Sequence, residues 1–454
     1  MCAILKLNLF VCERMLRIPY CLREMLKLRL FHKGQFPIIS EMLQKNKIRR
    51  NIKMFKKLLS VLLVVFMVAT LCISMTSCGN KKSDFKLGVI LLHDEASTYD
   101  LNFIEAVNRA AKELGLEEDQ VVFKKNIPES NECYEAAADL VDEGCDIIFA
   151  DSFGHETYLI KAAKEFKDVQ FCHATGTMAH TEKLDNFHNA FASIYEGRFL
   201  AGVAAGMKLN EMIAAGDITA EQAKMGYVGA FTFAEVISGY TSFYLGAKYI
   251  CPSVTMDVQF TGSWYDQNAE KNAALALIER DCVLISQHAD SMGAPSACEE
   301  NGVPNVSYNG STKASCPETF IVSSKIDWTP YFVYICEAVM DEEEIDVDWT
   351  GTLKTESVAL TEVNEAAAAA GTKEKIAEVK KLLEEGKLRV FDTNTFTVEG
   401  EKLDSFMADV DTDDNYTPDT EVIKDGYFHE SEYRAAPYFN IFIDGITLVN
   451  TNFG

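Results

Sequence analysis

From residue 85 onward the chain alternates short apolar segments with amphipathic ones, and this alternation restricts the fold more than any other feature. The segment "KLGVILL" (86–92) is typical of a buried strand. The next segment, "NFIEAVNRAAKELG" (102–115), puts its apolar side chains on one helical face and ends at Gly115. Because "QVVFKK", "ECYEAAADLVDEG" and "CDIIFAD" repeat this order, the sequence predicts an α/β fold with parallel sheets covered by helices on both faces.

Length and an internal echo predict two lobes. The roughly 375 residues that follow the N-terminal hydrophobic segment exceed what one core usually accommodates. Residues 137–152 and 274–290 each read as a helix end, a turn and a buried strand that begins near a cysteine and finishes in polar residues. This loose similarity indicates two lobes built on one plan.

The N-terminal hydrophobic segment reads as an export signal. Lys56 and Lys57 precede seventeen residues without a charge, and small residues then lead to Cys78. This layout resembles a bacterial lipobox, so we expect residues 54–77 to be a lipoprotein signal peptide and Cys78 to carry the lipid. A plain signal peptide or an uncleaved anchor is the alternative, although the apolar segment is short for a membrane span.

The same layout places the true start at Met54. A signal normally begins at the N-terminus, so residues 1–53 are interpreted as a mis-annotated upstream extension, and residues 78–84 as a lipidated linker. N-terminal sequencing of a precursor held uncleaved would check this, since a chain beginning at Met1 would contradict it.

The net charge of the chain also changes sign near Cys78. Residues 1–77 hold 14 basic and 3 acidic side chains, which leaves 29 basic and 65 acidic ones and a net charge of −36 beyond them. Nucleic-acid binding needs a basic face, so the sequence argues against it. Acidic runs such as "DEEEIDVD" (341–348) are interpreted as solvated surface.

Motifs for catalysis, cofactors and metals are weak. The eight cysteines beyond Cys78 show no metal-ligand spacing, so we expect no metal and interpret several of them as small core residues. No nucleotide-binding glycine motif appears, and no cofactor is expected. "ADSFGH" resembles a hydrolase nucleophile elbow with Ser152 as nucleophile and one of three histidines, His155, His173 or His288, as base. Ala150 stands where that elbow needs glycine, so we do not expect an enzyme.

Ligands bind beyond the carboxyl ends of strands in parallel sheets, which locates the candidate contacts. The segments that come after predicted strands are "HDEASTYD" (93–100), "DSFGHE" (151–156), "ATGT" (174–177), "FTFAEV" (231–236), "QHAD" (287–290) and "YNGST" (308–312).

Four longer segments resemble one known family. They are residues 146–176 with Ala-Thr-Gly, "YEGRFLAGVAAG" (195–206), residues 234–291 with "GSWYD" and "QHADS", and residues 426–446. The chain resembles the basic membrane protein family of substrate-binding lipoproteins, which includes purine nucleoside receptors of ABC importers. The resemblance covers roughly residues 85–350 and the C-terminal stretch.

This resemblance implies the type I periplasmic-binding-protein fold, with two Rossmann-like lobes joined by three crossing segments. We expect lobe 1 to hold residues 85–190 and 322–352, and lobe 2 to hold residues 191–321 and 353–400, with an acidic excursion and final strand at 401–454.

By the same resemblance, the protein is a lipid-anchored, extracytoplasmic binding component that captures a small heterocycle between its lobes. The ligand is expected to be a purine nucleoside or nucleobase, and the partners a membrane permease and an ATPase. A surface sensor or adhesin-like lipoprotein with the same fold is the alternative.

The resemblance also implies site residues, with aromatic side chains stacking on the base and polar ones bonding its edge. The candidates are Tyr99, Asp100, Asp151, Ser152, Phe153, Phe231, Glu235, Trp264, Asp290, Asn309, Lys325 and Trp328. Two segments depart from the family pattern: "SYNGST" lacks the usual acidic residue, and "KIDW" puts Lys325 and Asp327 near a crossing.

Overall fold

The computed structural model describes residues 84–410 and 420–451 of the chain. All of these residues belong to a single compact unit of the chain. The predicted start at Met54, the signal peptide and the lipidated Cys78 lie outside the described residues.

The first lobe is built on a six-stranded sheet in which all neighbouring strands run parallel. Its central strands are completely buried and rich in Ile, Val and Phe, as expected for a sheet covered on both faces. In sheet order the strands are β11 (Asp348–Gly351), β5 (Phe187–Ala192), β4 (Gln170–Ala174), β3 (Ile147–Ala150), β1 (Leu87–Ile90) and β2 (Val121–Lys124).

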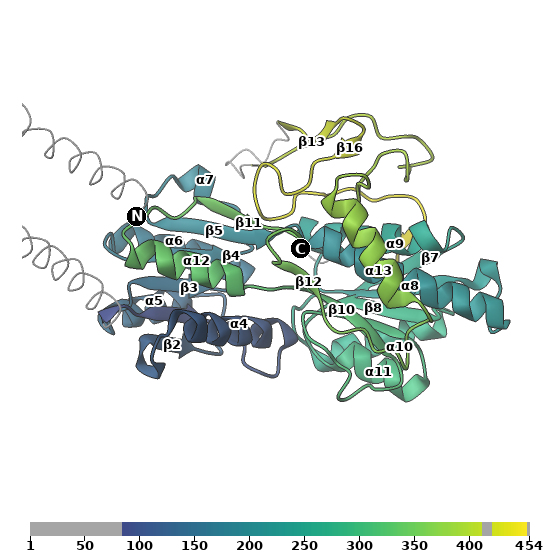
Figure 1. Cartoon of the computed structure of the whole chain (residues 1–454), viewed down its shortest axis with the longest axis horizontal. Coiled ribbons are helices and arrows are strands. Elements are labelled where there is room, and N and C mark those ends of the chain that lie inside the picture. Colours follow the sequence, from purple (N-terminus) through teal and green to yellow (C-terminus); the bar gives the residue numbers. More distant parts are fainter. Residues whose placement is uncertain (1–83, 411–419, 452–454) are drawn as a thin grey trace, which may run out of the picture. The chain divides into compact units, whose positions relative to one another are not determined.

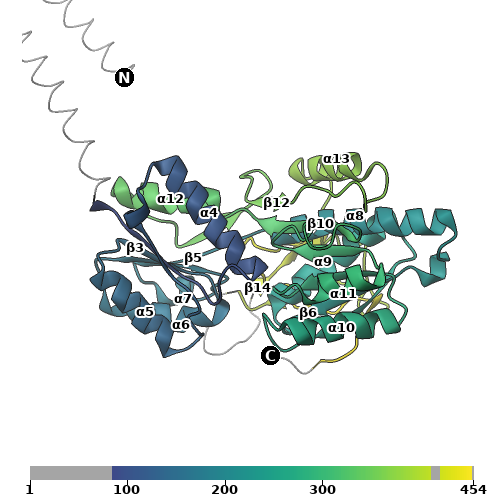
Figure 2. The same cartoon turned by 90° about the horizontal axis from the view of Figure 1, so that it is seen from below.

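Helices cover both faces of this sheet (Figure 2). On one face α4 (Thr98–Leu114) packs against α12 (Thr329–Met340), and on the other α5 (Asn131–Asp142) packs against α6 (Glu156–Glu165). Ser97 caps α4 by accepting a hydrogen bond from the amide of Asp100, and Gly115 ends the helix in a left-handed conformation, as the sequence predicts. Shorter helical turns are η1 (Glu118–Gln120), η2 (Phe153–His155) and α7 (Ala179–Glu182).

The second lobe is built on a seven-stranded sheet that is parallel except where β10 meets β12. In sheet order its strands are β12 (Val358–Leu360), β10 (Phe320–Ile326), β9 (Asn305–Tyr308), β8 (Leu284–His288), β6 (Lys224–Gly229), β7 (Thr255–Phe260) and β17 (Ile446–Leu448). Its helices are α8 (Ile194–Ala215), α9 (Ala234–Ile250), α10 (Gln267–Glu279), α11 (Gly293–Asn301), α13 (Thr372–Glu384) and the short η3 (Ala220–Gln222). Two parallel sheets of this kind confirm the predicted fold class.

Glycines let the two longest helices of the second lobe touch backbone to backbone. A Cβ atom on Gly202 of α8 would come within 2.0 Å of the carbonyl oxygen of Phe243, and one on Gly246 of α9 would come within 2.0 Å of that of Phe199. Both positions therefore exclude any larger side chain. This contact explains why the segment "RFLAGVAAG" is rich in small residues.

The chain crosses between the lobes three times (Figure 1). The crossings come after β5 at residue 193, after β10 at residues 327–328 and after β11 at residues 352–357. Two of them touch, because the amide of Asp327 donates a hydrogen bond to the carbonyl of Ser357. Helix α4 also holds the second crossing, since Arg109 pairs with Asp327 over 3.0 Å. Three crossings agree with the type I binding-protein fold.

Two lobe boundaries differ from the sequence-based expectation. Residues 191 and 192 still belong to β5 of the first sheet, so the first crossing comes after them. Residue 322 lies inside β10, which pairs with β9 and β12 of the second sheet, so the second crossing comes after Ile326. The reason is that "FIVSSKI" is a continuous, mostly buried strand. The C-terminal stretch holds the small hairpins β13 (Met407–Ala408) with β14 (Thr420–Glu421) and β15 (Ile423–Lys424) with β16 (Tyr427–Phe428), and then β17 joins the edge of the second sheet.

All eight cysteines among the described residues are free and buried, which agrees with their interpretation as core residues. Within residues 84–410 and 420–451, no cluster of three or more His, Cys, Asp or Glu side chains is arranged to hold a metal ion. In the same described part of the chain, no helix has the length and apolar character needed to span a membrane.

Candidate ligand-binding site

A pocket lies between the two lobes at the carboxyl ends of the strands. Twelve residues line it: Leu92, His93, Tyr99, Asp100, Ser152, Phe153 and Thr175 from the first lobe, and Glu235, Trp264, His288, Asp290 and Tyr308 from the second. We call these two sets the first wall and the second wall. Each of the six strand-end segments identified in the sequence contributes at least one of these side chains.

The first wall is held by hydrogen bonds within its own lobe. The Tyr99 hydroxyl donates to the carbonyl of Asp151 over 2.7 Å, and the His93 amide donates to Asp100 Oδ1 over 2.7 Å. The Ser152 hydroxyl donates to Glu129, whose carboxylate also accepts from the Gly154 amide. These bonds fix the loops after β1 and β3.

Asp100 and Asp151 form a buried carboxyl pair behind the first wall. Asp151 is 0% exposed and Asp100 is 1% exposed. Burial raises the pKa of Asp151 well above its usual range, and the charge of Asp100 raises it further. Burial also acts to raise the pKa of Asp100, but hydrogen bonds from His93 and Ser97 outweigh it, so that pKa is lowered. The two pKa values are therefore shifted in opposite directions, because two adjacent negative charges would repel.

The second wall combines aromatic rings with acidic groups. Phe231 stacks on Phe233 with ring centroids 5.2 Å apart and meets Trp264 edge-on at 5.0 Å. Glu235 Oε1 lies 3.3 Å from His288 Nε2. Burial lowers the pKa of His288 to about 4, so at neutral pH this imidazole is uncharged. Below this wall Arg198 lies 3.3 Å from the centre of the Tyr308 ring.

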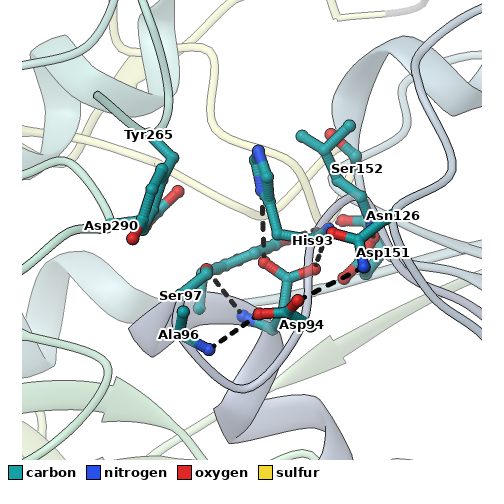
Figure 3. A network of polar contacts seen from close by, with 12 residues as sticks. His93, Asp94, Ala96, Ser97, Asn126, Asp151, Ser152, Tyr265 and Asp290 are labelled. Carbon is teal, nitrogen blue, oxygen red and sulfur yellow. Dashed lines mark hydrogen bonds and ion pairs between the residues drawn. The ribbon is translucent and has the colours of Figure 1, made fainter. Parts of the chain in front are cut away.

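The two walls touch at a few points. Thr98 at the start of α4 donates from its amide (3.0 Å) and its hydroxyl (3.2 Å) to the carbonyl of Asp290. His93 packs against Tyr265 with ring centroids 5.2 Å apart, and Figure 3 shows His93 facing Tyr265 and Asp290 across the pocket. Phe153 packs on Phe233 at 5.3 Å.

The pocket is narrow in this conformation. Its cavity volume is only about 20 Å³, far below the roughly 300–1,000 Å³ of small-molecule sites. A ligand of several rings therefore requires the lobes to separate before it enters, as in hinge closure.

Seven of the twelve candidate residues from the sequence line the pocket: Tyr99, Asp100, Ser152, Phe153, Glu235, Trp264 and Asp290. Three others lie next to it. The carboxyl group of Asp151 accepts a hydrogen bond from the amide of Leu92. Phe231 packs edge-on against Trp264. Asn309 comes directly after Tyr308 and is 3% exposed.

Two candidates lie elsewhere. Trp328 is 1% exposed and stacks on Phe103 in the core of the first lobe, with ring centroids 4.7 Å apart. Its assignment to the pocket is corrected, because a large aromatic at a crossing is buried more completely by helices α4 and α12 than a cleft allows. Lys325 lies on β10 and is not among the residues that line the pocket.

Sequence reasoning missed five lining residues: Leu92, His93, Thr175, His288 and Tyr308. Four of them lie inside the strand-end segments, so the sequence pattern indicates their general location. It does not indicate which side chains in each segment face the pocket. Tyr308 in particular is held by Arg198, which is distant in sequence and lies in α8.

Ser152 does not have the geometry of a nucleophile. Its hydroxyl donates to Glu129, and His173 Nε2 contacts the backbone carbonyl of Ser152 instead of its side chain. His155 Nε2 contacts the carbonyl of Ile127. None of the three histidines proposed as bases makes a hydrogen bond to this hydroxyl among the described contacts.

Comparisons with known proteins agree with this arrangement. A purine-binding protein of Brucella abortus is 31% identical over 222 residues, which cover 49% of this chain and 59% of that protein. A protein of Haloferax volcanii, provisionally named as the glucose-binding protein of an ABC transporter, is 31% identical over 207 residues, which cover 45% of this chain and 49% of that protein. The matched segments thus span about half the length of these relatives.

The fold is similar to the solved structure of a solute-binding protein of an ABC transporter system from Aeropyrum pernix, with a TM-score of 0.56 and 18% identity over 68% of this chain and 93% of that one. Residues 88–390 match the family model described as ABC transporter substrate-binding protein PnrA-like. Because this match covers more than half of the chain, the protein belongs to the PnrA-like family of ABC transporter substrate-binding proteins.

Proposed function

We propose that this protein is the extracytoplasmic, lipid-anchored binding component of an ABC importer, and that it captures a purine nucleoside or nucleobase. The observation that carries the proposal is the pocket itself, in which aromatic rings and carboxyl groups from both lobes converge at the carboxyl ends of the strands. The purine-binding relative of Brucella abortus supports the choice of ligand class.

Stacking would hold the flat part of such a ligand. Trp264 and Phe153 present partly exposed rings from opposite walls. Phe231 and Phe233 pack on Trp264, and Phe233 also contacts Phe153 across the pocket. Base–aromatic stacking contributes about 1–3 kcal/mol per base in nucleic-acid sites.

Polar groups would then decide which heterocycle stays. Asp100, Glu235 and Asp290 line the pocket, as do Ser152 and Thr175, whose hydroxyl oxygens can still accept a hydrogen bond. A ligand that leaves one of these buried groups unpaired loses affinity by orders of magnitude, whereas a ligand that matches them is retained.

Transport depends on closure of the lobes. With the pocket too narrow to admit a ligand in this conformation, capture and release require the lobes to open around the three crossings. The permease and ATPase of the importer are the proposed partners. A lipid on Cys78 would keep the protein at the outer face of the membrane, next to that permease.

The ligand proposal is tested by mass spectrometry of small molecules released from the denatured protein, followed by calorimetric titration with adenosine, guanosine, adenine and glucose. We expect a purine or its nucleoside to bind in the micromolar range or tighter and glucose not to bind. Trp264→Ala should weaken binding, and Tyr249→Ala, which removes an aromatic ring that is 47% exposed outside the pocket, should not. Binding of glucose and of no purine would contradict the proposal.

Lipid anchoring is tested by growing the native host with radiolabelled palmitate and separating membranes from soluble fractions. Wild-type protein should take up the label and stay with the membrane. Cys78→Ala should lose both properties. An unlabelled wild-type protein, or a labelled Cys78→Ala variant, would contradict the assignment of this cysteine.

A further inference from the structure

The pocket has an unusual balance of charge. Three carboxyl groups line it, those of Asp100, Glu235 and Asp290, and Asp151 lies directly behind them. No Lys or Arg is among the lining residues. The guanidinium of Arg198 lies over the Tyr308 ring and donates to the carbonyl of Gln287 over 3.0 Å.

Asp290 has no partner for its side chain among the described residues. Its amide donates to the carbonyl of Trp264 and its carbonyl accepts from Thr98, so the backbone is fixed. Among residues 84–410 and 420–451, by contrast, no hydrogen bond or ion pair reaches its carboxyl group, although Asp290 is only 7% exposed. An ionised carboxyl group that is buried is normally paired, and Asp290 lines a pocket that offers it no Lys or Arg side chain.

The surroundings of Asp290 disfavour the ionised form of its carboxyl group. Burial raises the pKa of Asp290 well above its usual range, and the charges of Asp100, Glu270 and Glu235 raise it further, against a smaller opposite effect of Arg198. The other titratable groups that face it or its neighbours are His93, Tyr99, Asp151, His155, His288 and Tyr308.

The Asp100–Asp151 pair on the opposite wall adds negative charge that is satisfied differently. One oxygen of each carboxyl group accepts a backbone amide, from His93 for Asp100 and from Leu92 for Asp151. The second oxygen of each is fully buried, and the two carboxyl groups share a hydrogen bond. Asp290, in contrast, has no such neighbour among the described residues.

Aromatic faces surround these acids. Tyr99, Phe153 and Trp264 line the same pocket, and a ring face attracts a cation placed over it. Carboxyl groups without a counter-ion and aromatic walls both favour the same kind of ligand.

We propose that the ligand supplies the missing positive charge, so that the pocket selects a nitrogen heterocycle that is cationic when bound, with Asp290 as the group that faces the charge. This inference rests on the proposed function and narrows its ligand class. Two routes lead to the bound cation. A heterocycle with a fixed charge displaces the proton of Asp290 to solvent, whereas a neutral heterocycle with a basic ring nitrogen takes that proton from the carboxyl oxygen. Both routes leave a carboxylate beside a cation.

The test uses three nucleosides that differ only in the base: inosine, which has no amino group; adenosine, which has a basic ring nitrogen; and 1-methyladenosine, which carries a fixed positive charge. Each is titrated calorimetrically into the full-length protein between pH 5 and pH 7, in two buffers of different ionisation enthalpy. We expect 1-methyladenosine to bind about tenfold tighter than inosine, as charge-assisted contacts allow, with adenosine between them.

The pH dependence gives a second readout. Because a fixed cation competes with the proton on Asp290, the affinity for 1-methyladenosine should rise with pH and its binding should release protons. The affinity for inosine should stay flat or fall. Inosine binding as tightly as 1-methyladenosine, or an affinity for the cation that falls with pH, would overturn the proposal.

Matched variants locate the effect. Asp290→Asn keeps the shape of the side chain and removes its charge, so the preference for 1-methyladenosine over inosine should fall below about threefold. Glu95→Gln removes one negative charge from an exposed residue that pairs with Lys125 outside the pocket, and it should leave the preference unchanged. An unchanged preference in Asp290→Asn would contradict the role of Asp290.

Failure of the proposed function has a different signature. If none of the three nucleosides binds, the purine assignment is wrong, and the charge proposal is judged with 1-methylnicotinamide, a cation, against neutral nicotinamide. Binding of the cation alone would support the charge proposal without purines. Binding of neither, or of nicotinamide alone, would overturn it.

Discussion

The two walls of the pocket are built differently. On the first wall, loops after β1 and β3 are tied down by hydrogen bonds to Tyr99, Asp100 and Ser152 within their own lobe. On the second wall, rings stack on one another and Asp290 is left without a side-chain partner among the described residues. The side chains of the first wall are therefore held in place by the protein itself. On the second wall, the carboxyl group of Asp290 remains available for a contact with the ligand.

Substitutions on the first wall should therefore affect mainly the stability of the protein, and substitutions on the second wall mainly its affinity for the ligand. Removing a group from a wall that satisfies its own hydrogen bonds leaves buried donors or acceptors unpaired and lowers the free energy of unfolding. Removing a group that has no partner changes the folded protein little but removes a contact for the ligand. Variants of the two walls should thus fail in different assays.

The largest effect is expected from Trp328, which sequence reasoning assigned to the pocket and the structure places behind the first wall. Trp328→Ala would leave a cavity among Phe103, Phe149 and Phe191, so the free energy of unfolding should fall by about 3–5 kcal/mol. Chemical denaturation followed by circular dichroism measures this. The milder Trp328→Phe should bind ligand with unchanged affinity, and a large loss of affinity there would return this residue to the site.

Asp151 should behave as a first-wall residue. Asp151→Ala removes the acceptor of the Leu92 amide and the hydrogen-bonding partner of Asp100, so we expect a loss of about 2–3 kcal/mol in the free energy of unfolding. Asp151→Asn keeps an acceptor for Leu92 and should lose less. Equal stability of all three proteins in urea denaturation would show that this buried pair does not hold the first wall.

Trp264 should behave as a second-wall residue. Trp264→Ala removes a stacking surface, and we expect the dissociation constant for a bound purine to rise about 10- to 100-fold. Its melting temperature without ligand should change less than that of Asp151→Ala, because Trp264 is only half-buried. Calorimetry and differential scanning fluorimetry on the same samples make the comparison. Loss of stability with unchanged affinity would reverse the roles of the walls.

The smallest effect concerns pH. The folded-state pKa of Asp290 lies above the value of about 3.9 in an unfolded chain. Its contribution to stability is therefore complete below about pH 4 and is lost as the pH rises through the folded-state pKa. Asp290→Asn cannot titrate, so its melting temperature between pH 5 and pH 8 should fall by about 2 °C less than that of the wild type. An identical pH profile for both proteins would show that Asp290 is not held protonated by burial.

The sequence predicts the framework well, for physical reasons. Strand–helix alternation determines parallel sheets, the caps Ser97 and Gly115 bound α4 as expected, and the six strand-end segments all reach one pocket. The family match confirms the predicted resemblance to substrate-binding proteins of ABC transporters. Because this family binds solutes, the match agrees with the prediction that the protein is not an enzyme.

What the sequence does not predict depends on long-range packing. The burial of Trp328 results from two helices that meet over the first sheet, and the position of Tyr308 depends on Arg198, over a hundred residues earlier. The absence of a counter-charge for Asp290 among the described residues is visible only once every neighbouring side chain is in place. Local patterns carry no information about such contacts.

The most direct measurement is a titration of adenosine followed by tryptophan fluorescence. The described part of the chain holds Trp264 in the pocket, with Trp328 and Trp349 in the first lobe. We predict a saturable change in emission that persists in Trp328→Phe and disappears in Trp264→Phe, while calorimetry shows that Trp264→Phe still binds. Saturable binding by calorimetry that leaves the emission of Trp264 unchanged would mean that the ligand is held elsewhere, and the pocket between the walls would not be the binding site.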